Sequence, residues 1–242
     1  MDNYKKNLKL LTENHVYSED MEHDACGVGV IASTEGKKSR EIVEYGIEAL
    51  KAVWHRGAVD ADGKTGDGAG IHVEIPKDFF IEKIEVTGHD YDNSEICVGM
   101  IFLPRNDYSS QESCKTIVES ELTKNDFSIY GWRQVPVNPK ILGEKAFQTM
   151  PEIIQVLFKS NVSNLIDKDL ERKIYETRKK IENKAFELSL NNFYICSISS
   201  KSIIYILKKW ALHLLFMNLH PVFISPVRIN FSIMSNSSKR LS

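Results

Sequence analysis

Acidic residues and glycines are both missing from the C-terminal part of this chain. No Asp or Glu occurs after Glu187, and no Gly occurs after Gly143, although the sequence continues to Ser242. Glycine adopts turn conformations that strain other residues, so its absence is unusual in a segment that still has to reverse direction. The basic residues of this segment have no acidic neighbours to balance them. These departures indicate a divergent tail at residues 206–242.

Cysteines are few and widely spaced. The four of them form no Cys-x-x-Cys pair and have no histidine at metal-ligand spacing: Cys26, Cys97, Cys114 and Cys196. Structural zinc and iron–sulfur sites need clustered ligands, so we expect no metal site in this chain. No N-terminal secretory segment is visible. We therefore expect reduced thiols and a cytoplasmic location.

Long apolar runs and a strong net charge are missing too. Residues 210–223 are apolar but contain His213, Asn218, His220 and Pro221, whereas a membrane helix needs about 20 predominantly apolar residues. The formal net charge of −2 gives no electrostatic reason to bind nucleic acid or an anionic membrane. We expect neither as a partner.

The chain does contain alternating strand and helix patterns without a regular βαβ repeat. Its 242 residues, 42% of them apolar, can bury a sizeable core. The apolar spacing predicts strands at residues 26–33, 71–75, 96–103, 127–135, 153–158, 193–198 and 202–206, and helices at 39–54, 76–83, 109–122 and 170–188. This order predicts an α+β fold with a layered sheet core.

Capping residues mark two of the helix starts. Ser39 is a suitable N-cap with Glu41 in the first turn, and Ser109 or Ser110 can cap the helix near residue 110. Residues 1–25, by contrast, show no clean strand or helix period beyond a possible short turn. We interpret them as a leader outside the core.

A small-residue run, DACGVGVIA at residues 24–32, places Cys26 at the start of the first predicted strand. The glycines beside it let backbone and substrate approach a thiol closely, which suits a nucleophile. The alternative is a packing cysteine at a strand start, because free cysteines are among the most buried residues. Cys26 alone does not decide between the two.

A glycine-rich loop, DGKTGDGAG at residues 62–70, precedes the second predicted strand. Its Gly63-Lys64-Thr65 step resembles part of a phosphate-binding loop. Such a loop must open a helix, and here more glycines and a strand follow. We interpret the run as a tight, irregular connection and not as a nucleotide site.

Several runs resemble, in the same order, the glutaminase domain of glutamate synthase large subunits, a class II glutamine amidotransferase. They are EHDACGVG at 22–29, HRGA at 55–58, TGDGAG at 65–70, GWRQVPV at 131–137, Leu142-Gly143 and FYICS at 193–197. The likeness covers roughly residues 21–205. It implies the four-layer αββα sandwich of N-terminal-nucleophile hydrolases, with a leader at 1–25, a partial amidotransferase domain at 26–205 and a divergent tail at 206–242.

The same resemblance implies the site residues. Removal of the leader would make Cys26 the N-terminal nucleophile that attacks the side-chain amide of L-glutamine, with its own α-amino group as the base. Arg56 matches the arginine that orders the nucleophile; its alternative is a surface residue at a helix end. Structural positions near the site are Gly27, Gly57, Asp67 and Gly68.

The tail departs from the family pattern. It contains no counterpart of the segments that supply the carboxylate-binding arginine and the oxyanion-hole Asn and Gly, which leaves the substrate-binding residues unknown. We expect an incomplete sandwich with unpaired sheet edges, and a truncated or frame-shifted gene end.

Two functional hypotheses follow. One is a glutaminase domain that supplies ammonia for glutamate biosynthesis; the other is a catalytically inactive fragment or binding module, since loss of one oxyanion donor alone costs about a hundred- to a thousandfold in rate. For the full-length family enzyme the resemblance implies FMN, an iron–sulfur cluster, synthase domains and a small subunit or ferredoxin. For this chain it implies no cofactor.

Overall fold

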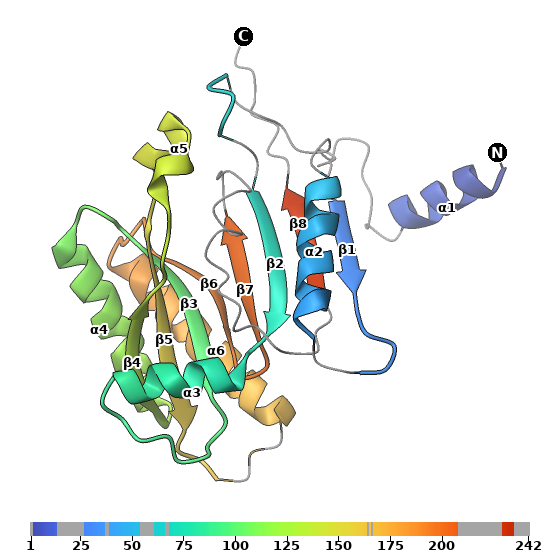
Figure 1. Ribbon diagram of the computed structural model, residues 1–242. Helices are drawn as coiled ribbons and strands as arrows, with labels where there is room; N and C mark the ends of the chain where they lie inside the picture. Colours follow the sequence, from blue (N-terminus) through green and yellow to red (C-terminus); the bar gives the residue numbers. More distant parts are fainter. Residues whose placement is uncertain are drawn as a thin grey trace.

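Two antiparallel four-stranded sheets with flanking helices make up the chain, confirming the predicted α+β class (Figure 1). The computed structural model describes residues 2–13, 27–36, 39–53, 61–65, 68–163, 165, 167–207 and 229–234. The first sheet has the order β1 (Gly27–Ile31), β8 (Ile229–Met234), β2 (Gly68–Glu74) and β7 (Ser202–Leu207). The second has the order β4 (Phe127–Gln134), β5 (Glu152–Ser160), β3 (Cys97–Leu103) and β6 (Tyr194–Ser199).

The helices agree with the predicted apolar spacing, with corrections at their ends. The four predicted ones are α2 (Arg40–Ala52), α3 (Lys77–Val86), α4 (Tyr108–Lys124) and α6 (Asp167–Glu187). Ser39 caps α2 by accepting a hydrogen bond from the Glu41 amide at 3.1 Å. The predicted cap of α4 was wrong: Asp107 is the N-cap, because its carboxylate accepts the Ser110 amide at 3.0 Å.

Three helical elements were not predicted. They are α1 (Asp2–Glu13), the 3-10 turn η2 (Pro139–Ile141) and α5 (Glu144–Gln148). Helix α1 is rich in residues with good helix propensity, such as lysine, leucine and glutamate, and needs no regular apolar face to form. No described helix is both long enough and apolar enough to span a membrane.

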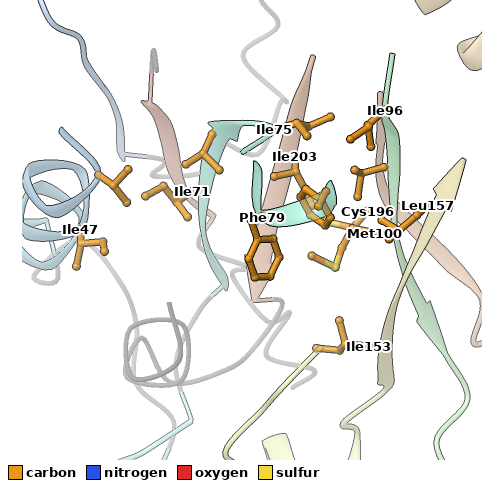
Figure 2. Packing of buried hydrophobic residues seen from close by; sticks show 14 of the residues in the cluster. Ile47, Ile71, Ile75, Phe79, Ile96, Met100, Ile153, Leu157, Cys196 and Ile203 are labelled. Carbon is orange, nitrogen blue, oxygen red and sulfur yellow. The ribbon is translucent and has the colours of Figure 1, made fainter. Parts of the chain in front are cut away.

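The second sheet is buried on both faces. Along β3, Val98 and Met100 join the cluster shared with the first sheet and α3, whereas Cys97, Ile101 and Leu103 join the cluster under α4 and α6. This alternation is the two-residue period of a strand. Figure 2 shows the shared cluster extending from α2 through the first sheet to the second, with Ile47, Ile71, Ile203, Met100 and Leu157 among its members.

Strand β8 comes from the tail and lies inside the first sheet. It pairs with β1 on one side and β2 on the other, with Ser232 opposite both Val28 and Gly70. Apolar residues alternate with Asn230 and Ser232 along this strand, which is a period that suits pairing.

Strand β1 is the described strand to which the expected unpaired sheet edge refers. Strand β1 ends the order of the first sheet, and its Val28 and Val30 side chains are 67% and 59% exposed. Among the described strands, β8 from the tail thus lies in the middle of the sheet and β1 has no partner on its outer side. The boundary at residue 205 stays a prediction.

Candidate active site

The predicted site residues fall into two groups. Gly27 and Gly68 are the first residues of β1 and β2. Cys26, Arg56, Gly57 and Asp67 lie outside the described residues. The geometry of the site must therefore be built from the described segments that flank these four positions.

The starts of β1 and β2 lie at the same end of the first sheet. Both strands run antiparallel to β8, so they run parallel to each other. Gly27 and Ala69 are both register partners of Ile233. Two strand spacings separate them, roughly 9–10 Å. The strand ends that adjoin Cys26 and Asp67 in the sequence are thus neighbours across a single intervening strand.

Helix α2 ends at this same end of the sheet. It contacts β1, β8 and β2 and runs opposite to β1, as Figure 1 shows. Thirteen residues of helix rise about 20 Å, close to the length of the strands beside it. Its C-cap, Val53, precedes the segment that contains Arg56. Three separate runs of the sequence therefore meet at one end of the first sheet.

A tight turn at residues 61–65 precedes the start of β2 at this end of the sheet. The Asp62 carboxylate accepts hydrogen bonds from the Lys64 amide at 2.9 Å, the Thr65 amide at 2.7 Å and the Thr65 hydroxyl at 2.5 Å. Gly63 has a φ of +66°, in the left-handed region that glycine adopts without strain. Thr65 is only 6% exposed, and Gly68 follows three residues later, within about 10 Å along the chain.

Gly143 lies directly against this turn. A Cβ atom at position 143 would overlap with Asp62 Oδ2 and Thr65 Oγ1. It would have to push these two oxygens aside, so their hydrogen-bonded arrangement requires glycine here. The contact joins two runs of the family likeness, the glycine-rich loop and Leu142-Gly143, which are far apart in the sequence.

The electrostatics of the turn follow from its hydrogen bonds. The Thr65 hydroxyl, the Thr65 and Lys64 amides and the nearby Lys145 ammonium lower the pKa of Asp62 to about 2. Asp62 therefore remains a carboxylate at any pH at which the protein would act. Its role is to accept hydrogen bonds, because a group with so low a pKa cannot serve as a base near neutral pH.

Sequence reasoning missed the contribution of Asp62, Thr65 and Gly143 as a unit. A signal was present, because an Asp three residues before a Thr in a glycine-containing run is typical of side-chain-capped turns. The comparison of Gly63-Lys64-Thr65 with a phosphate loop drew attention to the lysine instead. Lys64 contributes only its backbone amide to the turn.

The segment that carries Gly143 has a small core of its own. Leu142, Ala146 and Met150 are buried together. Arg105 covers them, since its guanidinium donates to Met150 Sδ at 3.4 Å and lies 4.9 Å from the Phe147 ring centroid. This connection between β4 and β5 is thus anchored independently of the turn that it holds.

The Gly131–Val137 run also has a structural explanation. Arg133 donates to Gln155 Oε1 at 2.7 Å, and its guanidinium lies 5.1 Å from the ring centroid of Phe79 on α3. Trp132 donates to Glu119 of α4 at 2.6 Å. This run ties β4 to the elements on both faces of the second sheet.

The described thiols are poor candidates for catalysis. Cys97, Cys114 and Cys196 are free and buried. Burial, followed by the charges of Glu171 and Glu95, raises the pKa of Cys97 far above its usual value, and burial raises the pKa of Cys114 to about 11. The thiolate is the reactive form, so Cys97 and Cys114 are unreactive at neutral pH. Cys26 lies outside the described residues and stays the predicted nucleophile.

The described residues do not fit a metal or iron–sulfur centre. Within the described ranges no three His, Cys, Asp or Glu side chains come together as a metal site requires. Of the three described cysteines, Cys97 and Cys114 lie in one buried cluster and Cys196 lies in the other.

Comparison with known proteins shows the family to which the chain is similar. Residues 26–225 match the family described as "Glutamine amidotransferases class-II". The chain is 51% identical over 202 residues to the glutamate synthase [NADPH] large chain of Azospirillum brasilense, covering 84% of this chain and 13% of that one. It is 40% identical over 202 residues to ferredoxin-dependent glutamate synthase 1 of Arabidopsis thaliana, covering 82% and 12% respectively. The chain thus spans only about an eighth of the length of these curated relatives.

Proposed function

The chain belongs to the class II glutamine amidotransferases, and from this premise we propose that it is the glutaminase domain of a glutamate synthase. The reaction is hydrolysis of L-glutamine to glutamate and ammonia for glutamate biosynthesis. The observation that supports the proposal is that three described segments next to the motifs lie at one end of the first sheet. The starts of β1 and β2 and the end of α2 adjoin Cys26, Asp67 and Arg56 there.

The proposed chemistry is nucleophilic. The Cys26 thiol loses its proton to a base and its sulfur attacks the side-chain amide carbon of glutamine. The C–N bond then breaks, the nitrogen leaves as ammonia with the transferred proton, and a γ-glutamyl thioester remains on Cys26. Water hydrolyses the thioester to glutamate and regenerates the thiol.

The proposed base is the α-amino group of Cys26 itself. A free α-amino group has a pKa of about 7.7–8.0, close to the working pH that suits a group shuttling one proton. While Ala25 is attached, this nitrogen is an amide and cannot accept a proton. Removal of residues 1–25 is thus part of the proposed activation. Arg56 is proposed to order the nucleophile and its surroundings.

The proposal extends to the architecture. We propose a four-layer αββα arrangement, in which α2 covers the first sheet and α4 and α6 cover the second. The contacts of α2 with β1 and β8, and of α4 and α6 with β3, β4 and β6, support this order. The division into residues 1–25, 26–205 and 206–242 is part of the same proposal.

Cofactors and electron donors belong to the rest of a glutamate synthase in this proposal. FMN, an iron–sulfur cluster, the synthase domains and a small subunit or ferredoxin would lie outside this segment, which binds L-glutamine. Among the described residues, no three cysteine, histidine or carboxylate side chains come together to hold such a cluster. A cytoplasmic location is proposed with it.

Mass spectrometry and ammonia release test the glutaminase. The expected results are a chain that begins at Cys26, one equivalent of the diazoketone glutamine analogue 6-diazo-5-oxo-L-norleucine bound at that residue, and ammonia release abolished by Cys26→Ala. A chain that keeps Met1 and an unmodified Cys26 thiol would contradict the proposal.

A second candidate is a catalytically inactive product or binding module. It is favoured by the sequence of the tail, where β8 fills the middle of the first sheet without an arginine or glycine among its residues 229–234. Such a protein would bind no glutamine analogue covalently. Ammonia release from glutamine that depends on Cys26 would rule this candidate out.

A further inference from the structure

The turn at residues 61–65 connects two parts of the fold that are distant in sequence. On one side only residues 66 and 67 separate Thr65 from Gly68, where β2 starts in the first sheet. On the other side Asp62 and Thr65 lie against Gly143, in the connection between β4 and β5 of the second sheet. The turn therefore connects the two sheets at the end where β1 and β2 begin.

We infer that Asp62, Thr65 and Gly143 are positioning residues for the glutaminase, an inference that rests on the proposed function. Thr65 is fixed on one side of residues 66–67 and Gly68 on the other, since Thr65 is bonded to Asp62 and buried, and Gly68 is paired in the sheet. The described residues on both sides of positions 66–67 are therefore held in place. None of the three residues is assigned contact with the substrate.

The geometry separates positioning from general stabilisation. Asp62 is solvent-exposed, whereas Thr65 is buried, so loss of the hydrogen bonds between them costs some global stability. Their further effect is local, on where Thr65 lies, and a reagent that tests only thiol access does not report it. A displacement of about 1 Å at an active site can lower a rate about a hundredfold, so local order at this turn has a large effect on chemistry.

Gly143 sets the other half of the contact. A Cβ atom at position 143 would overlap with Asp62 Oδ2 and Thr65 Oγ1, so any side chain there must push these oxygens out of their hydrogen-bonded positions. The segment behind Gly143 has its own buried cluster of Leu142, Ala146 and Met150. A substitution at 143 is therefore expected to move the turn and leave that cluster in place.

The chain offers a matched control in the cap of α4. Asp107 accepts the Ser110 amide at 3.0 Å and the Ser110 hydroxyl at 2.6 Å. This is the same pair of hydrogen bonds that Thr65 gives to Asp62. Ser110 lies in the first turn of α4, a helix that packs on the second sheet. Ser110→Ala removes an equivalent hydroxyl elsewhere.

The experiment compares two reagents on Cys26 in the full chain. One is 6-diazo-5-oxo-L-norleucine, which must bind as glutamine does, and the other is iodoacetamide, which needs only an accessible thiol. Rates come from intact mass with peptide mapping, and the melting temperature from calorimetry. The variants are Asp62→Ala, Thr65→Val and Gly143→Ala, with Thr65→Ser as the conservative replacement and Ser110→Ala as the control.

Positioning predicts a split between the reagents. Asp62→Ala, Thr65→Val and Gly143→Ala should slow the analogue by about tenfold or more and leave iodoacetamide labelling nearly unchanged, while the melting temperature falls by only a few degrees. Thr65→Ser should retain most of the analogue rate, and Ser110→Ala should retain all of it.

Each other outcome has a definite meaning. If the wild-type chain takes up iodoacetamide but never the analogue, the proposed function fails, and the inference falls with it. If the wild type is labelled and all three variants match it, the inference alone is overturned. If both reagents and the melting temperature fall together in all three variants, the turn is merely structural and positioning is again overturned.

Discussion

Glu171 is the residue that ties the β6–β7 hairpin to helix α6. Its carboxylate accepts the Ser199 hydroxyl at 2.9 Å and both the amide and hydroxyl of the buried Ser200 at 2.7 Å. This hairpin passes from the second sheet to the first, so one side chain steadies the crossing between them.

Replacing Glu171 with alanine should destabilise the fold. The buried amide and hydroxyl of Ser200 would lose their acceptor, which costs about 1–3 kcal/mol for such groups. Urea unfolding measures the effect. Glu176→Ala is the control, since Glu176 is an exposed residue of the same helix. Equal unfolding midpoints for the two variants would show that the Glu171 hydrogen bonds contribute nothing.

Asp92 is the residue expected to govern part of the acid response. The Lys159 ammonium, followed by Ser94 and the Tyr130 hydroxyl at 2.8 Å, holds the pKa of Asp92 well below its usual value of 3.8. The folded state therefore binds a proton at Asp92 less readily than the unfolded state does. The contribution is present above about pH 4 and is lost as the pH falls below it.

Asp92→Asn should make the melting temperature less sensitive to pH below 4. The asparagine cannot titrate, so the proton-linked part of the acid destabilisation disappears. Melting curves from pH 7 to pH 2 for wild type and variant test this. An acid limb equally steep in both would assign the response to other carboxylates, such as Asp62, whose pKa is lowered to about 2.

At the scale of elements, β8 determines how the first sheet is assembled. It is the only described partner of β1, and it separates β1 from β2. In a central strand the amides point in turn to the two neighbours, so each of them has a ladder acceptor. A residue without an amide hydrogen is thus incompatible with the middle of β8.

Ser232→Pro should disrupt the first sheet, whereas Ser232→Ala should not. Proline removes a ladder hydrogen bond and is excluded from central strands; the unpaired acceptor alone costs about 1–3 kcal/mol. Alanine keeps the amide and isolates the side-chain contribution. Thermal unfolding of both variants tests the prediction. If the proline variant melted with the wild type, residues 229–234 would not form the paired strand.

At the scale of the whole molecule, one buried cluster joins both sheets. Its members come from α2, β2, α3, β3, β5 and β7, among others. Loss of one sheet's assembly should therefore lower the stability of the other as well, because the cluster buries apolar surface from both.

Ending the chain after Leu207 should abolish cooperative unfolding. This change removes β8, leaving β1 without a partner among the described strands and uncovering part of the surface that α2 packs on. Calorimetry should show a broadened, weakened transition, and light scattering should show association through the new edges. A sharp transition at the full-length melting temperature would mean that the tail adds nothing to the fold.

Local sequence patterns were sufficient to predict most of the elements. The spacing of apolar residues marked the strands of the second sheet and helices α2, α4 and α6, since each pattern repeats within a few residues. Helix ends were predicted less accurately: Ser109 or Ser110 was expected to cap α4, whereas Asp107 does so. The tail strand was missed because its alternation is short and its surroundings differ from the family pattern.

The candidate site was predicted as a set of motifs without a geometry. The runs around Cys26, Arg56 and Asp67 were recognised in the sequence, and the roles of these residues stay predictions. The pairing of Asp62 and Thr65 with Gly143 was not anticipated, although each residue stood in a recognised run. A close approach between residues about eighty positions apart leaves no periodic trace in the sequence.

The sequence by itself determined the α+β class, the family and the identity of the proposed nucleophile, because these depend on local periodicity and on short runs of specific residues. Only the tertiary structure decided that β8 lies between β1 and β2, that α2 ends at the end of the sheet where both begin, and that Gly143 meets the Asp62 turn. Register and close packing are set by contacts between distant segments. Their energies depend on which surfaces meet, and no single segment encodes that choice.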